Sequence, residues 1–184
     1  MNRRAFLRVA GVTALGGSAM LVAACGGGGG TNTTPAPTNA QSDVDILNNA
    51  LNVENTAIAI YAAALKVLTG ADLGMARQHL GQEMAHADAL SKAVQKLGGT
   101  PSLPLPSYSK AIGHPKTPGD MLRLADTIET TAISAYLGAI PKLSDLTLRQ
   151  TVAAIVTNEA EHLSVVRTAL HLSPVPSAFV RGAA

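Results

Sequence analysis

Two short motifs in the sequence combine a carboxylate with an imidazole three residues later. They are Glu83-x-x-His86 and Glu159-x-x-His162. Residues three apart project from the same face of a helix, so each motif would present its two side chains together. Glu54 and Glu129 add one carboxylate from each of two other expected helices. Four carboxylates and two imidazoles can hold two metal ions, for which iron or manganese is expected and zinc is an alternative.

The charges around these glutamates favour metal binding over ion pairing. The chain has five glutamates, and Glu161 is the one expected to face water, because it lies about 200° around its helix from Glu159. Burying the other four carboxylates without partners would cost several kcal/mol each. No Lys or Arg lies on the apolar stripes that carry them, so metal ions are the expected source of positive charge.

Four other side chains lie within reach of this set. Tyr61 follows Glu54 by seven residues, and Tyr136 follows Glu129 by the same spacing. They are either redox-active beside the metals or, as we favour, core residues whose hydroxyls make buried hydrogen bonds. His79, one turn before Glu83, is interpreted as a core or boundary histidine. Asp126, one turn before Glu129, either helps to orient a histidine ring or, as we favour, is a surface or capping residue.

Helical periodicity predicts four amphipathic helices that would carry these residues. The expected ranges are about 42–70, 72–97, 117–140 and 145–170. Thr117-Pro118-Gly119-Asp120 predicts a capping box at the third start, and Ser144 or Asp145 opens the fourth helix. On the first helix, Asn48, Asn52 and Asn55 are placed on the polar face, opposite the stripe of Glu54.

The connections between the helices predict their topology. Short breaks join the first pair and the second pair, so each pair is antiparallel. Residues 98–116 contain four prolines and three glycines and form a long connection. Extended, these 19 residues reach about 63 Å, against about 38 Å for a 25-residue helix. We therefore expect an all-α, antiparallel four-helix bundle with one long crossover between the second and third helices, which is the ferritin-like connectivity.

The two halves of the bundle repeat each other. Residues 53–61 recur as residues 128–136, an offset of 75, and residues 83–86 recur as residues 159–162, an offset of 76. Two helix pairs related in this way predict a bundle with approximate twofold symmetry.

This ligand pattern resembles that of the ferritin-like di-iron carboxylate superfamily, and within it the exported ferritin-like domain proteins of bacteria. The resemblance covers about residues 43–172. It implies two iron ions with Glu54 and Glu129 as terminal ligands, Glu83 and Glu159 as bridging ligands, and His86 and His162 as one imidazole per ion. Some relatives have an aspartate before the second glutamate of each half, whereas this chain has Gln82 and Asn158.

The N-terminal residues indicate export and anchoring. Residues 1–25 combine Arg3, Arg4 and Arg8 with an apolar run and are interpreted as a signal peptide that resembles a twin-arginine signal. Val22-Ala23-Ala24-Cys25 resembles a lipobox, which implies a lipid on Cys25 and attachment to the extracytoplasmic face of a bacterial membrane. Residues 26–41 are expected to be a flexible linker, residues 42–173 the bundle and residues 174–184 a tail.

Composition excludes several functions. Three of the 14 basic residues lie in the first eight positions, and the other 11 are outnumbered by 12 acidic residues. The rest of the chain therefore has no excess of positive charge for phosphates, and no nucleic acid partner is expected. A single cysteine excludes a disulfide framework and CxxC redox pairs.

We expect ferroxidase or O2- or peroxide-reducing chemistry with an external electron donor. A non-catalytic metal-binding protein and a manganese catalase are the alternatives, and a second copy forming a homodimer is a candidate partner.

Overall fold

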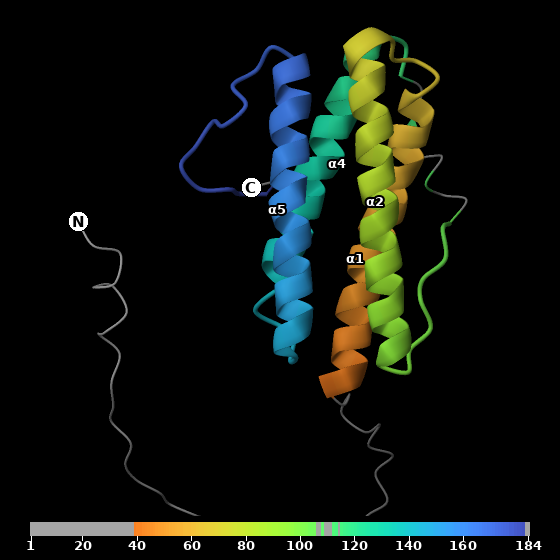
Figure 1. Cartoon of the computed structure of the whole chain (residues 1–184), viewed down its shortest axis with the longest axis vertical. Coiled ribbons are helices and arrows are strands. Elements are labelled where there is room, and N and C mark those ends of the chain that lie inside the picture. Colours follow the sequence, from red (N-terminus) through yellow and green to blue (C-terminus); the bar gives the residue numbers. More distant parts are fainter. Residues whose placement is uncertain (1–38, 106–107, 109–111, 114, 183–184) are drawn as a thin grey trace, which may run out of the picture. The chain divides into compact units, whose positions relative to one another are not determined.

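The computed structural model describes residues 39–105, 108, 112–113 and 115–182. This part of the chain contains four long helices and no strand. They are α1 (Asn39–Ala64), α2 (Gly70–Lys96), α4 (Pro118–Ala139) and α5 (Leu146–Ala169). The helices lie side by side, with α1 and α5 running in one direction and α2 and α4 in the other (Figure 1). The predicted all-α bundle with a long connection between its second and third helices is confirmed.

Local sequence signals explain where three of the helices begin. The capping box at α4 is present: Thr117 Oγ1 accepts a hydrogen bond from the Asp120 amide at 3.1 Å, and the Asp120 carboxylate accepts one from the Thr117 amide at 3.0 Å. Asp145 caps α5 by accepting from the Leu148 amide at 3.0 Å. Gly70, at the reversal between α1 and α2, has φ of 57°, a conformation that glycine adopts without steric cost.

The start of α1 differs from the prediction. The helix begins at Asn39, so residues 39–41 extend it instead of belonging to the linker. The Asp43 carboxylate is buried and accepts hydrogen bonds from the amide and hydroxyl of Ser144. Asp43 therefore joins α1 to the turn between α4 and α5.

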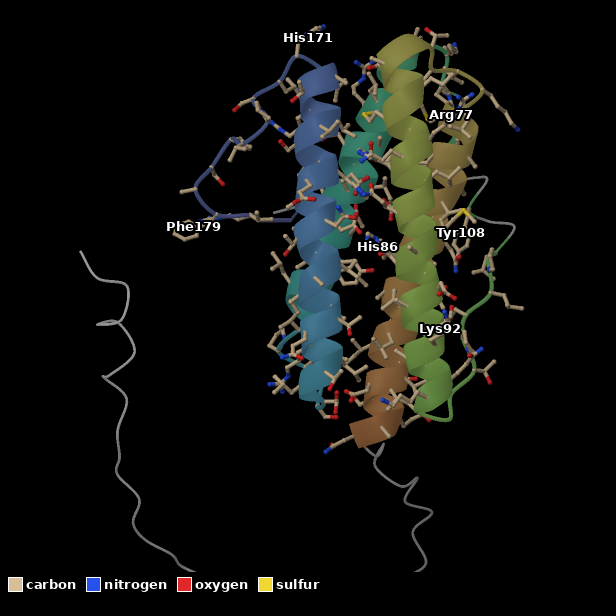
Figure 2. The ribbon with its side chains drawn as sticks, viewed as in Figure 1. Arg77, His86, Lys92, Tyr108, His171 and Phe179 are labelled. Atoms are coloured by element: carbon tan, nitrogen blue, oxygen red, sulfur yellow. The ribbon has the colours of Figure 1, made fainter. Side chains whose placement is uncertain are left out.

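The crossover covers part of the polar face of α1. Asn48 accepts a hydrogen bond from the Ser102 amide at 2.8 Å and donates one to the Thr100 carbonyl at 3.0 Å. Tyr108, on the far side of α2 from α5 in Figure 2, donates to Asn52 at 3.0 Å. The prediction that Asn55 faces water is wrong: its side chain is buried in the hollow that α1 shares with crossover residues.

The apolar core consists of two clusters. One takes its residues from the first half of α1, the second half of α2, the second half of α4 and the first half of α5; it includes Leu51, Leu90, Ile133 and Val152. The other occupies the opposite end of each helix. In every helix the candidate metal ligands fall in the sequence between these two apolar segments. The site is therefore held between two apolar layers.

Among the helices in the described part of the chain, none is long and apolar enough to span a membrane.

The capping box predicts a measurable stability change. Thr117→Ala removes the hydroxyl that satisfies the Asp120 amide, and we expect the free energy of unfolding to fall by about 1 kcal/mol. Urea denaturation followed by circular dichroism measures this. Thr127→Ala, which removes an exposed hydroxyl bonded to a carbonyl within α4, is the matched control and is expected to change stability by less than about 0.5 kcal/mol. Equal losses in both variants would contradict the capping role.

Candidate metal centre

All six predicted ligands meet at the centre of the bundle. Each helix contributes one glutamate, and α2 and α5 each add a histidine one turn further on. The glutamates are at most 1% exposed. His86 Nδ1 lies 2.8 Å from Glu159 Oε1, and His162 Nδ1 lies 3.0 Å from Glu83 Oε1. Each histidine therefore contacts the glutamate of the other half of the chain as well as its own.

The six predicted ligands form two groups that overlap. One group contains Glu54, Glu83, His86 and Glu159; the other contains Glu83, Glu129, Glu159 and His162. His79, which was not predicted as a ligand, forms a third and smaller group with Glu129 and His162. Within each group the candidate atoms all lie within 4.8 Å of one another. Glu83 and Glu159 belong to both groups, which is the arrangement that two metal ions bridged by two carboxylates require.

The hydrogen bonding at the centre fits a metal site. Seven buried atoms of the six side chains have no hydrogen-bond partner, including both carboxylate oxygens of Glu159 and Nδ1 of both histidines. The nitrogen–oxygen distances are short, yet the atoms are not aligned as donors and acceptors. Buried polar atoms are almost always paired. Unpaired nitrogens and oxygens that converge from four helices are therefore well suited to ligate metal ions.

The buried carboxylates of the cluster are offset by protons and by the charge of the histidines. Burial raises the pKa of Glu54 to about 8 and holds that of Glu129 well above its ordinary value. Burial opposes charge on His86 too, but Glu159, Glu54 and Glu83 raise its pKa to about 12. Protons thus partly offset the carboxylates when no metal is bound. Metal ions would replace these protons, as metal binding to carboxylate and imidazole ligands generally does.

The tyrosines hold the outer carboxylates. Tyr61 donates a hydrogen bond to Glu129 Oε1, and Tyr136 donates one to Glu54 Oε1, each from the opposite half of the chain. Both rings are fully buried, and burial raises the pKa of each hydroxyl well above its usual value. The structure thus agrees with the favoured interpretation of both tyrosines as core residues whose hydroxyls make buried hydrogen bonds. The tyrosines remain neutral donors that orient Glu54 and Glu129.

Two residues of α2 support His162 in ways that the sequence did not reveal. Gln82 Oε1 lies 2.9 Å from His162 Nε2. His79 is buried, its ring stacks on that of His162 at 4.1 Å between centroids, and its Nδ1 lies 3.1 Å from the Tyr61 hydroxyl. Burial and the neighbouring His162 lower the pKa of His79 to about 4, so its ring is neutral. His79 lies one turn before Glu83, and Gln82 lies directly before it. These positions were the available signal, but they could not say which neighbour each residue meets.

Other candidates lie away from the ligands. Asn158 donates to Glu161 at 3.1 Å, and Glu161 is exposed as predicted. Asp126 is half-buried and lies 3.5 Å from Arg167. Cys25 lies outside the described residues.

A four-helix bundle with a central cluster of carboxylates and imidazoles defines the class of ferritin-like proteins. The sequence matches the ferritin-like domain over residues 42–172. The chain therefore belongs to the ferritin-like domain family.

Solved structures share the fold. A conserved hypothetical protein from Mycobacterium tuberculosis is 18% identical with a TM-score of 0.66, covering 70% of this chain and 96% of its own. A ferritin-like di-iron carboxylate protein from Bacillus anthracis is 21% identical with a TM-score of 0.63, covering 73% and 99%. A bacterioferritin-related dodecameric thioferritin from Bacteroides fragilis is 23% identical with a TM-score of 0.62, covering 72% and 86%. No curated protein sequence matches the chain.

The shared carboxylates lead to a direct test. Glu83→Ala or Glu159→Ala removes a residue common to both ligand groups, so we expect either change to abolish binding of the metal pair. Glu161→Ala, on the same helix as Glu159 but exposed, is the matched control and is expected to keep the full metal content. Elemental analysis of the purified proteins measures the result. Equal loss in all three variants would contradict the assignment of faces.

Proposed function

We propose that this protein binds two iron ions at the centre of its bundle and reduces O2 or peroxide there. The observation that carries the proposal is the pair of ligand groups sharing Glu83 and Glu159, whose buried atoms lack other partners. The carboxylate-rich set with one imidazole in each group suits iron, and manganese or zinc remain alternatives. The Bacillus anthracis neighbour is described as a di-iron carboxylate protein, which supports the same choice.

Bound iron would supply the electrons for reduction of the oxidant, and the residues around the ligands would perform two tasks. Tyr61 and Tyr136 hold the carboxylates of Glu129 and Glu54 in fixed orientations. The two apolar clusters on either side exclude bulk water, which strengthens the electrostatic interactions within the site.

Access for a small oxidant is proposed on the side of His86. Its side chain is 12% exposed, whereas those of the four glutamates and His162 are at most 2% exposed. His86 lies between α2 and α5 (Figure 2). So small an exposed area suits O2 or peroxide better than a larger organic substrate. The electrons that restore Fe(II) would come from an external donor, because the one cysteine of the chain cannot form a CxxC redox pair.

Oxygen consumption tests the proposed reaction. The protein loaded anaerobically with two equivalents of Fe(II) is expected to consume O2 or peroxide faster than the same concentration of free Fe(II). Glu159→Ala is expected to return the rate to that of free Fe(II), and Glu161→Ala to retain the wild-type rate. An oxygen electrode and stopped-flow absorbance follow the reaction.

Each alternative function has its own outcome in that assay. Tightly held zinc with no Fe(II)-dependent turnover would replace the proposal with a structural metal site. Oxygen evolution from peroxide by the manganese-loaded protein would make it a manganese catalase. A wild-type rate no faster than that of free Fe(II) would contradict the reductase proposal.

We also propose that the bundle is anchored to the extracytoplasmic face of a bacterial membrane through a lipid on Cys25. The lipobox-like residues and the glycine-rich stretch after them support this. The tether would leave the bundle free to meet diffusing oxidants and an electron donor at the membrane.

Fractionation of bacterial cells tests the anchor. The full chain is expected in the membrane fraction and to incorporate labelled fatty acid, whereas Cys25→Ser is expected to lose the label and become soluble, because it lacks the thiol that is acylated. Ser42→Ala is the control and should fractionate as the wild type. Continued membrane association of Cys25→Ser would show that the lipobox interpretation is wrong.

A further inference from the structure

The two halves of the site have matching ligands but different neighbours. The offset of 76 that relates Glu83 to Glu159 and His86 to His162 also pairs His79 with Ile155 and Gln82 with Asn158. The ligands are thus repeated, whereas the residues that support them are not. Because the two halves repeat each other, each residue of one half can be compared with the residue at the matching position of the other.

The Glu129–His162 half is held by a chain of contacts. Tyr61 has one hydroxyl proton, which it donates to Glu129, so His79 must donate from Nδ1 to the Tyr61 oxygen. The other ring nitrogen of His162, Nε2, donates to Gln82 Oε1, which leaves Nδ1 facing the carboxylates. Stacking of His79 on His162 restricts rotation of that ring. The carboxylate of Glu129 and the ring of His162 are therefore both held in place in the absence of a metal ion.

The Glu54–His86 half lacks these supports. Tyr136 orients Glu54, as Tyr61 orients Glu129. The position that matches His79 is Ile155, whose side chain has no polar atom to bind a tyrosine. Asn158, which matches Gln82, donates instead to the exposed Glu161. His86 is 12% exposed, against 2% for His162.

We propose that the two metal positions are inequivalent, and that the position at Glu129 and His162 binds its ion first and more tightly. The position at Glu54 and His86 takes the second, exchangeable ion. His79 and Gln82 are positioning residues that set this difference. Ligands held in place by outer hydrogen bonds lose less freedom on binding, and such partners change metal affinity by about 10- to 100-fold. This inference rests on the dinuclear site of the proposed function.

Binding of Mn(II) to the metal-free full chain tests the order of filling. Titration calorimetry gives the two dissociation constants, and electron paramagnetic resonance distinguishes an isolated Mn(II) from an exchange-coupled pair. We expect the first equivalent to give the isolated signal and the second to convert it to the coupled signal. His86→Ala is expected to keep the tight phase and lose the weak one. His162→Ala is expected to lose the tight phase.

Variants at the matching positions 79 and 155 test the cause of the difference. His79→Ile copies the residue of the other half and is expected to weaken the tight phase about tenfold or more while leaving the weak phase unchanged. His79→Gln keeps a donor for the Tyr61 oxygen and is expected to restore much of that loss. Ile155→Val, which changes only packing, is the matched control and is expected to leave both constants unchanged. Circular dichroism confirms that each variant is folded.

The outcomes separate this inference from the proposed function. A coupled signal from the first equivalent, equal effects of His86→Ala and His162→Ala, or a His79→Ile change that shifts both phases alike would overturn the inference while leaving a dinuclear site. A wild-type protein that binds neither Mn(II) nor Fe(II) would overturn the proposed function and this inference together.

Discussion

The burial of four carboxylates inside one apolar bundle governs the structure of this protein. Each glutamate is at most 1% exposed, and in the described residues the nearest basic groups are two histidines that the carboxylates themselves keep charged. The charged histidines and the raised pKa values of Glu54 and Glu129 offset part of this charge, but taking ionised groups out of water still opposes folding. The apolar layers on either side must therefore supply the stability that holds these side chains in place.

The bundle meets this constraint by dividing its core. Each helix places apolar residues at both ends and its glutamate between them, so the two clusters hold all four helices together above and below the charged layer. The tyrosines then connect the halves across that layer, each from one half to a glutamate of the other. The geometry of the site is consequently a property of the whole bundle and not of any single helix.

The sequence was sufficient to predict the helices, their order and the convergence of the glutamates, because each depends on periodicity, capping and connection length. What it did not predict depends on contacts between helices. Asn55 lies on a polar face by periodicity, yet it is buried where the crossover meets α1. Gln82 contacts His162 of α5 instead of a residue near it in sequence. Asp43 accepts hydrogen bonds from Ser144, which lies about a hundred residues away in the sequence.

The same distinction explains how one repeated motif can have two different surroundings. The ligand residues recur at a constant spacing because glutamate and histidine must lie on the same face of their helix. A change in that spacing would turn one of them away from the site. The residues around them are free of that requirement, since they act only through packing and hydrogen bonds to the ligands. His79 and Ile155 occupy equivalent places, and only the histidine extends the hydrogen bonding of a tyrosine. Under the proposed function, the repeat supplies the ligands for two ions, while its unmatched neighbours would determine how differently the two are held.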